Sequence, residues 1–123
     1  MIEFTNRIVI TGFGVVAQAV LPLLLKHLRI ALNRITVIDL ADRTAVLHPW
    51  LGPDGVRFVR ERVTPANLAE LLAGAVGRGG LIIDLAWGID FFDIVRWAHD
   101  NGVLYVNASL ESWEHTGEPR PTS

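Results

Sequence analysis

The sequence contains no cysteine among its 123 residues. This absence excludes a disulfide scaffold, thiolate zinc sites, cysteine-bound iron–sulfur clusters and cysteine nucleophiles. An excess of one charge is also missing, because 11 basic and 13 acidic side chains leave a net charge of −2. A balance this close to neutral implies neither a nucleic-acid-binding surface nor an acidic tail. We therefore expect no nucleic-acid partner.

Long hydrophobic runs are missing as well. The longest nearly apolar run covers residues 15–25 and is interrupted by Gln18. A bilayer-spanning helix needs about 20 apolar residues, so we expect no membrane partner. The first residues lack the basic start of a secretory signal, because Glu3 precedes Arg7. We therefore expect a cytoplasmic protein.

Apolar residues, by contrast, are abundant. They make up 50% of the chain against 20% charged residues, and the mean hydropathy is +0.35. This composition excludes a disordered chain, and the length suits a single domain. We assign residues 1–114 to that domain and interpret residues 115–123, which are polar and contain two prolines, as a linker or a truncated tail.

Short apolar runs alternate with helical patterns along the chain. The expected strands are residues 7–11, 35–39, 56–63, 81–85 and 103–106. The expected helices are residues 15–30, 64–76 and 90–100, with a short helix or loop within residues 40–55. This alternation predicts an α/β fold, a Rossmann-type doubly wound parallel sheet of about five strands in a three-layer sandwich.

The expected helices carry further signals. In residues 15–30 an apolar row has a spacing of four residues, and Pro22 predicts either a kink or a regular helix shorter than the pattern. That row comprises Val16, Val20, Leu24 and Leu28. Thr64 and Pro65 are an N-cap and a first-turn proline, which is typical of a helix start. The residues expected to face inward from the last helix are Phe92, Val95 and Trp97.

A glycine motif stands between the first expected strand and the first expected helix. Residues 12–17 read Gly-Phe-Gly-Val-Val-Ala and match the pattern G-x-G-x-x-A. The first glycine allows a tight turn, the second lets a pyrophosphate approach the helix N-terminus, and Ala17 lets the helix pack close to the strand. The motif predicts a dinucleotide site. Its candidate residues in this turn are Gly12, Phe13, Gly14, Val15 and Val16.

A carboxylate ends the next expected strand. Asp39 follows Ala17 by 39 − 17 = 22 residues, near the spacing of about 20 typical of dinucleotide-binding folds. A carboxylate there accepts hydrogen bonds from the adenosine ribose and repels a 2′-phosphate, so NAD is favoured over NADP. Arg43 favours the opposite, because an arginine at this point can bind that phosphate. The structural alternative is a glycine turn in which Asp39 only caps the next segment.

Two further strand ends are expected to face the same crevice. The loop after the fourth expected strand should line the nicotinamide side, with Asp84, Leu85, Ala86 and Trp87 as candidate cofactor-binding residues. Asp84 is also compatible with a structural carboxylate, and Trp87 with packing. Asn107 and Glu111 follow the fifth strand, and Glu111 is the candidate catalytic residue, because a lone carboxylate there can hold a cationic amine.

No metal site is expected. The four histidines lack the spacing of metal ligands. They are His27, His48, His99 and His115.

Several segments together resemble the N-terminal region of homospermidine synthases, which belong to the saccharopine dehydrogenase-like group. The resemblance runs from about Arg7 to Trp113. The segments that carry it are IVITGFG at 8–14, LPL at 21–23, VID at 37–39, DLAW at 84–87, NGVLYVN at 101–107 and LESW at 110–113.

This resemblance implies a reaction in which NAD is a recycling cofactor. A diamine such as putrescine is oxidised to an imine, a second amine displaces ammonia, and the new imine is reduced. By position, the glycine motif resembles the pyrophosphate loop, Asp39 the ribose acid, and Glu111 an active-site acid that meets a polyamine nitrogen. Some members have an acid where Gly88 stands in this chain.

The family's enzymes run to several hundred residues, with a substrate domain that has no counterpart after Ser123. We therefore expect the NAD-binding domain of a homospermidine synthase-like enzyme, inactive alone, that meets a polyamine only in a full-length context and forms a homodimer. One alternative is a stand-alone NAD-binding sensor or regulatory module that acts through a partner chain at the exposed edge of the fifth strand. Another is a small reductase-like enzyme completed by dimerisation.

Overall fold

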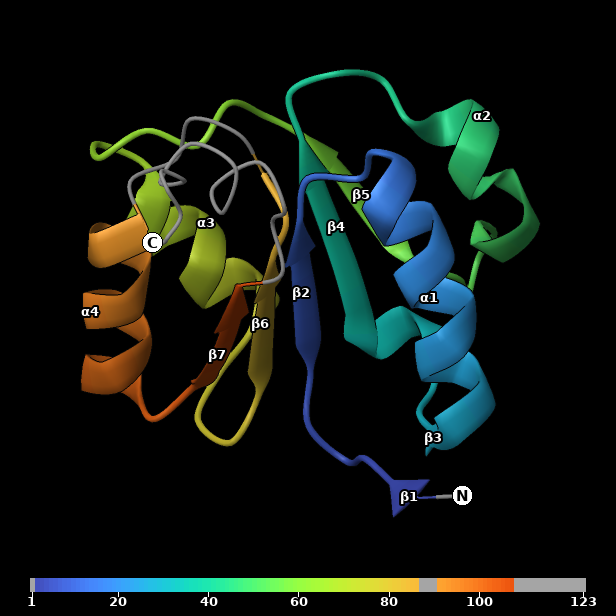
Figure 1. The fold of residues 1–123 in the computed structure, drawn as a ribbon, viewed down its shortest axis with the longest axis horizontal. Coiled ribbons are helices and arrows are strands. Elements are labelled where there is room, and N and C mark those ends of the chain that lie inside the picture. Colours follow the sequence, from blue (N-terminus) through green and yellow to red (C-terminus); the bar gives the residue numbers. More distant parts are fainter. Residues whose placement is uncertain (1, 87–90, 108–123) are drawn as a thin grey trace, which may run out of the picture.

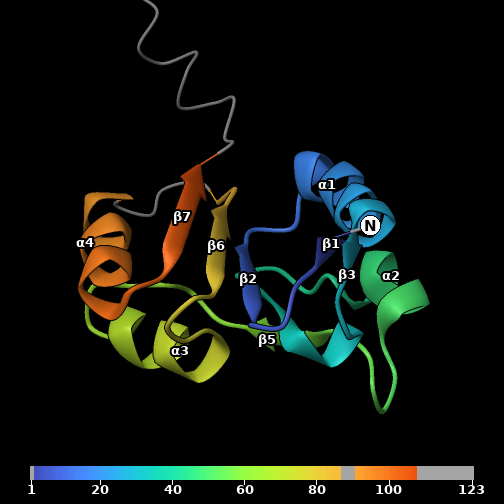
Figure 2. The same cartoon turned by 90° about the horizontal axis from the view of Figure 1, so that it is seen from below.

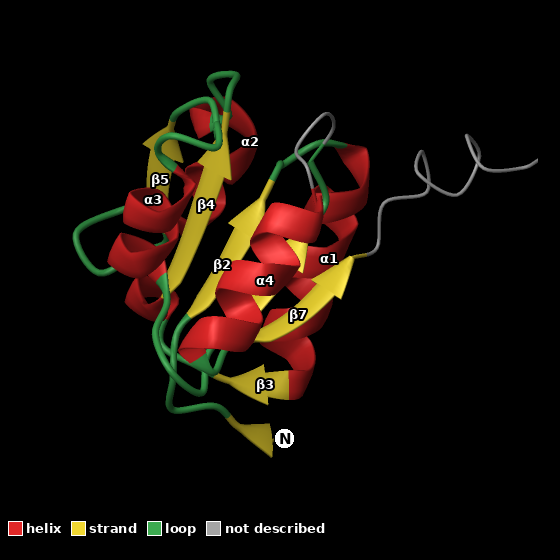
Figure 3. Ribbon diagram, turned by 90° about the vertical axis from the view of Figure 1, so that its left-hand side faces the viewer, coloured by secondary structure: helices red, strands yellow, loops and turns green. Residues whose placement is uncertain are grey.

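The computed structural model describes residues 2–86 and 91–107, and its centre is a five-stranded parallel sheet (Figure 1; Figure 3). In spatial order the strands are β5 (Arg57–Arg60), β4 (Ile35–Asp39), β2 (Ile8–Thr11), β6 (Leu81–Asp84) and β7 (Leu104–Asn107). Neighbouring strands are parallel throughout this sheet. Counted along the chain, the order 3-2-1-4-5 is that of a doubly wound sheet. The predicted fold class is confirmed.

Helices cover both faces of the sheet and complete the three layers (Figure 1; Figure 2). On one face lie α1 (Val15–His27) and α2 (Thr44–Leu47), and on the other lie α3 (Leu68–Ala75) and α4 (Phe91–Asn101). Single 3₁₀ turns, η1 (Leu32–Arg34) and η2 (His48–Trp50), precede β4 and follow α2. None of the helices in the described part of the chain is long and apolar enough to cross a membrane.

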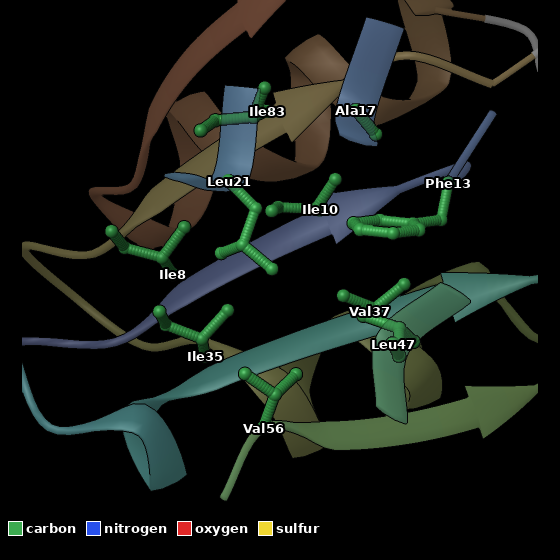
Figure 4. Packing of buried hydrophobic residues seen from close by; sticks show 10 residues of the cluster. All are labelled: Ile8, Ile10, Phe13, Ala17, Leu21, Ile35, Val37, Leu47, Val56 and Ile83. Carbon is green, nitrogen blue, oxygen red and sulfur yellow. The ribbon is translucent and has the colours of Figure 1, made fainter. Parts of the chain in front are cut away.

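Each face of the sheet has its own hydrophobic core, because successive strand residues point to opposite faces. On the α1 side, Ile8 and Ile10 of β2 pack with Ala17 and Leu21 of α1 (Figure 4). Val9, between those isoleucines, joins the other core. That second core also contains Ile38, Leu68, Leu72, Ala75, Val76, Ile82, Ile94, Ala98 and Val103.

The first helix is shorter than predicted, and Ala17 packs against the sheet as the glycine motif predicts. It runs through Pro22 and ends at His27, three residues before the predicted end, so the shorter-helix alternative is confirmed. The helix buries Ala17 and Leu21, whereas the predicted row is half-buried beside them. The tight glycine turn explains this, because it sets Ala17 directly against the sheet.

A small second sheet was not predicted. Here β1 (Ile2–Glu3) pairs in parallel with β3 (Leu28–Arg29), which directly follows α1. Strands of two residues carry no periodicity, so the sequence holds no signal for them. Four strands of the main sheet match the predicted ranges to about one residue, whereas β5 ends at Arg60, three residues before the predicted end.

The third helix begins at Leu68, later than the predicted start. The predicted N-cap is therefore wrong, because Asn67 is the N-cap residue of α3 and has no side-chain cap. Thr64 and Asn67 are instead joined across the turn before the helix. The Thr64 hydroxyl accepts the Asn67 N–H at 3.3 Å, and the Asn67 side-chain oxygen accepts the Thr64 N–H at 2.7 Å. This reciprocal pair closes the turn that precedes the helix. Residues 65–67 form a turn that leads into the regular helix.

The predicted inward face of α4 is wrong at one position. The buried residues are Ile94 and Ala98, while Phe92 is 67% exposed. At about 100° per residue, Phe92 lies on the side of the helix opposite to Ile94. Val95 and Trp97 flank the buried row and are half-buried. The helix ends at Asn101 and is followed by Gly102, whose φ of 68° a glycine adopts without strain.

Candidate functional site

The turn from β2 into α1 lies at the carboxyl-terminal ends of the parallel strands, here called the carboxyl edge of the sheet. Because β2 is the central strand, the turn lies in the middle of this edge. Gly12 donates its N–H to the Ile38 carbonyl at the end of β4 at 2.7 Å. Its φ is +84°, and a Cβ there would lie 2.8 Å from the Ala86 Cα in the loop after β6. A glycine is therefore required at position 12 for two reasons, the positive φ and the close approach of the loop after β6.

Gly14 is different, because nothing within the described residues requires a glycine there. Its φ is −83°, and a Cβ at this position would meet no atom within 4 Å. Gly14 is the N-cap residue of α1, has no side-chain cap, and opens onto free space. A glycine without an internal reason is expected where a ligand must approach the backbone.

The start of α1 suits an anionic group. The first intrahelical bond runs from Gln18 N–H to the Gly14 carbonyl, so the N–H groups before Gln18 precede the hydrogen-bonded ladder. The first turn contains no acidic side chain, and Val15 is 85% exposed. Free N–H groups together with the positive end of the helix dipole form a site for a phosphate.

Phe13 and Ala17 support this turn from beneath. Both side chains are fully buried, and the Phe13 ring belongs to the core on the α1 side (Figure 4). The Phe13 side chain therefore has no access to a ligand. Its backbone N–H points to the end of β4, where it donates to Asp39 Oδ2 at 2.6 Å.

Asp39 connects the end of β4 to the glycine turn. Besides the bond from Phe13, Asp39 accepts two more hydrogen bonds. The Ala41 N–H donates to Oδ1 at 2.9 Å, and Nε of Arg43 donates to Oδ2 at 3.0 Å. Burial alone would raise the pKa of Asp39, but the hydrogen bonds from Ala41 and Phe13 and the Arg43 charge together lower it. Asp39 is thus ionised, and a carboxylate and a guanidinium lie side by side at the predicted ribose position.

Asp84, at the end of β6, is a buried hydrogen-bond acceptor. It is 2% exposed, and its Oδ1 accepts the Thr11 hydroxyl at 2.8 Å and the Ala86 N–H at 3.3 Å. Its Oδ2 accepts the Tyr105 hydroxyl at 2.6 Å. These contacts support a structural role for Asp84. Through its bond to the Ala86 N–H, the carboxylate positions the loop after β6.

Thr11 and Tyr105 are residues of this edge that the sequence analysis missed. Both contact Asp84 across the sheet, since Thr11 and Asp84 share a register position and Tyr105 lies on the next strand. Burial, followed by the hydrogen bond to Asp84 and its charge, raises the pKa of the Tyr105 hydroxyl well above its usual value. The sequence alone holds no signal for these contacts, because they depend on the register of β2, β6 and β7.

The other predicted residues fall into two groups. Leu85 donates its N–H to the Thr11 carbonyl at 2.8 Å, and Ala86 touches the Gly12 turn, so the loop after β6 lies beside the glycine motif as predicted. Asn107 is exposed at the end of β7, next to Asp84 in the register. Trp87, Gly88 and Glu111, as well as the predicted tail at 115–123, lie outside the described residues. Among the described residues, no three His, Asp or Glu side chains gather in a way that could hold a metal ion.

Comparison with known proteins identifies this arrangement. The family model described as the saccharopine dehydrogenase NADP binding domain matches residues 8–120. The chain belongs to this family. The matched range includes the glycine motif, Asp39 and the loop after β6, and the predicted family resemblance is confirmed.

The chain is also similar to two proteins named homospermidine synthase. The chain is 32% identical over 114 residues to the enzyme of Mesorhizobium japonicum and 33% identical over 109 residues to that of Blastochloris viridis. These alignments cover 90% and 86% of this chain, but only 23% and 22% of those enzymes.

A solved structure gives the same result for the fold. The crystal structure of homospermidine synthase from Legionella pneumophila in complex with NAD superposes with a TM-score of 0.78 at 31% identity. It covers 87% of this chain and 23% of that one. This saccharopine dehydrogenase-type domain therefore spans less than a quarter of the length of the relatives that it matches.

Proposed function

We propose that this chain is the NAD-binding domain of a homospermidine synthase-like enzyme. The observation that carries the proposal is the open space at Gly14, beside the uncapped N-terminus of α1. It is supported by the similarity to an enzyme crystallised with NAD. In this proposal the N–H groups of Val15 and Val16 bind the pyrophosphate, and the missing side chain of Gly14 lets it approach.

Asp39 and the loop after β6 bind the two ends of the cofactor in this proposal. Asp39 accepts a hydrogen bond from a hydroxyl of the adenosine ribose. The Arg43 side chain, which donates to Oδ2, must shift so that the ribose hydroxyl can reach this oxygen. The stretch Leu85–Ala86 lines the nicotinamide side together with Trp87. Asp84 holds that stretch in place through its bond to the Ala86 N–H and does not act as a base.

In the whole enzyme, bound NAD supplies the hydride acceptor for amine oxidation and the donor for imine reduction. We propose that Glu111 holds a protonated polyamine nitrogen near this edge. Because the chain spans less than a quarter of its relatives, we propose that it is inactive alone and meets a polyamine only in a full-length context. The cytoplasmic location and the homodimer stay predictions from the sequence.

Calorimetric titration with NAD and NADP tests the cofactor proposal. We expect Asp39→Ala to weaken NAD binding about tenfold or more, because a charged acceptor for the ribose is lost. Asp39→Asn retains an acceptor for the Phe13 N–H and so separates ribose binding from support of the turn. Asp54→Ala, an exposed aspartate before β5, is the matched control and should bind like the wild type. Equal, weak binding of both cofactors by every variant would remove the assignment.

Arg43→Ala tests the preference between the two cofactors in the same titrations. Arg43 shares Oδ2 of Asp39 and is the guanidinium placed to meet a 2′-phosphate. We expect the variant to shift the ratio of affinities towards NAD by about tenfold. An unchanged ratio would mean that Arg43 does not face the ribose.

One observation favours a second candidate, the regulatory module. β7 is the last strand of the sheet, and Leu104 and Val106 on it are 64% and 47% exposed. An apolar edge strand is a surface to which another chain adds readily. A distinct protein retained on this chain in native mass spectrometry, and lost in Val106→Lys, would favour the module over the enzyme domain.

A further inference from the structure

Three arginines line a pocket at the amino-terminal ends of the parallel strands, opposite to the strand ends that carry the proposed dinucleotide site. The pocket has a volume of about 240 Å³ and is lined by Asn6, Arg7, Arg34, Gly77 and Arg78. Arg7 directly precedes β2, Arg34 directly precedes β4, and Arg78 lies in the loop before β6. Because β4, β2 and β6 are neighbours, the amino ends of three parallel strands bring these cations together.

The local contacts fix two of these side chains without neutralising them. Nη1 of Arg34 donates to the Thr5 carbonyl at 2.5 Å, and Nη1 of Arg7 makes a long bond of 3.4 Å to the Gly74 carbonyl. The Arg78 guanidinium lies against Gly102, where a Cβ would be 2.6 Å from Nη1. An arginine has several N–H donors, so one bond each leaves donors of Arg7 and Arg34 available.

Carboxylates are missing from this pocket. Its five lining residues include none, and within residues 2–86 and 91–107 the ion pair found is Asp39–Arg43, at the opposite edge. Three positive charges therefore share one concave surface without an anionic partner in the described part of the chain. Like charges held this close repel one another unless an anion binds between them.

We infer that this pocket binds the phosphate group of a small anionic ligand. The planar guanidinium fork matches the oxygens of a phosphate and binds them in pairs. A pocket of about 240 Å³ also leaves room for a small organic part beside the phosphate. The site is separate from the proposed dinucleotide site, because the pyrophosphate position at Gly14 lies at the carboxyl edge.

The test is an NMR titration of the 123-residue chain with inorganic phosphate at constant ionic strength, which removes the effect of salt screening. We expect saturable shifts of the backbone amides of Asn6, Arg34, Gly77 and Arg78 at millimolar phosphate. NAD should shift the amides of residues 12–17 instead, so failure of one site is distinguishable from failure of the other. Absence of saturable shifts at the pocket would overturn the inference.

Arg78→Gln is the variant of choice, because no hydrogen bond of its side chain within the described residues is needed for the fold. We expect it to weaken phosphate binding about tenfold. Arg96→Gln, at an exposed position of α4, is the matched control and should leave the affinity unchanged. Equal weakening in both variants, or an equal response to acetate, would show general charge attraction and contradict a phosphate site.

Discussion

Gly12 and Gly14 stand two residues apart, yet they are glycines for different reasons. Gly12 has a positive φ and lies against Ala86, so the fold itself requires it. Gly14 has an ordinary φ, and no described residue lies near the place of its missing side chain, so a glycine there is explained by the approach of a ligand. The two roles could be predicted from the motif, since a strand before it and a helix after it restrict where each glycine stands.

Substitution of each glycine by alanine separates these roles. We expect Gly12→Ala to lower the free energy of unfolding by about 2–4 kcal/mol, from backbone strain and the clash with Ala86. Gly14→Ala should change it by less than about 1 kcal/mol and still weaken NAD binding about tenfold or more. Urea denaturation and calorimetry measure the two effects. Wild-type NAD affinity in a folded Gly14→Ala would contradict the pyrophosphate position.

The contacts of the other site residues could be predicted only in part. Asp39 was placed correctly at a strand end, but its bond to Phe13 N–H depends on how the turn folds back over β4. Thr11 and Tyr105 became visible as partners of Asp84 only once the register of β2, β6 and β7 was known. Side-chain hydrogen bonds between strands depend on that register, which a single sequence does not specify locally.

Among the helices and strands, the buried strands could be predicted more fully than the inward face of α4. The runs of β2, β4 and β6 are mainly apolar and rich in β-branched residues, which favours buried parallel strands over any exposed structure. Right-handed crossovers then restrict the order in which such strands can lie in the sheet. The packing of Ala17 against the sheet could also be predicted, because the glycine turn before α1 fixes that contact. The inward face of α4 could not, because Phe92 is more hydrophobic than Ala98 but lies on the exposed side.

A matched pair of leucines on α1 tests its buried face. Leu21 is fully buried and packs on β2, whereas Leu23 on the same helix is 56% exposed. We expect Leu21→Ala to lower the free energy of unfolding by about 2–5 kcal/mol, because it leaves a cavity in the core. Leu23→Ala should lower it by about 0.5 kcal/mol. Denaturation curves with equal midpoints for the two variants would contradict this orientation of the helix.

In the molecule as a whole, the carboxyl ends and the amino ends of the parallel strands carry side chains of opposite charge. The carboxyl edge holds the glycine turn and the carboxylates of Asp39 and Asp84, which meet backbone N–H groups. The amino edge gathers the three arginines of the pocket. The parallel arrangement explains this separation, since it brings all strand ends of one kind to one edge. A ligand at one edge therefore leaves the other free.

The chain spans less than a quarter of the homospermidine synthases that it resembles, which limits the activity it can have alone. We expect it to bind NAD but to form no homospermidine from putrescine and NAD, because it spans about 23% of the enzymes it resembles. Product analysis by mass spectrometry checks this, with Gly14→Ala as the control for cofactor-dependent turnover. Homospermidine formed by the wild type and lost in Gly14→Ala would contradict an inactive domain. It would then favour a small enzyme completed by dimerisation, and sedimentation at several concentrations would show the dimer on which that activity depends.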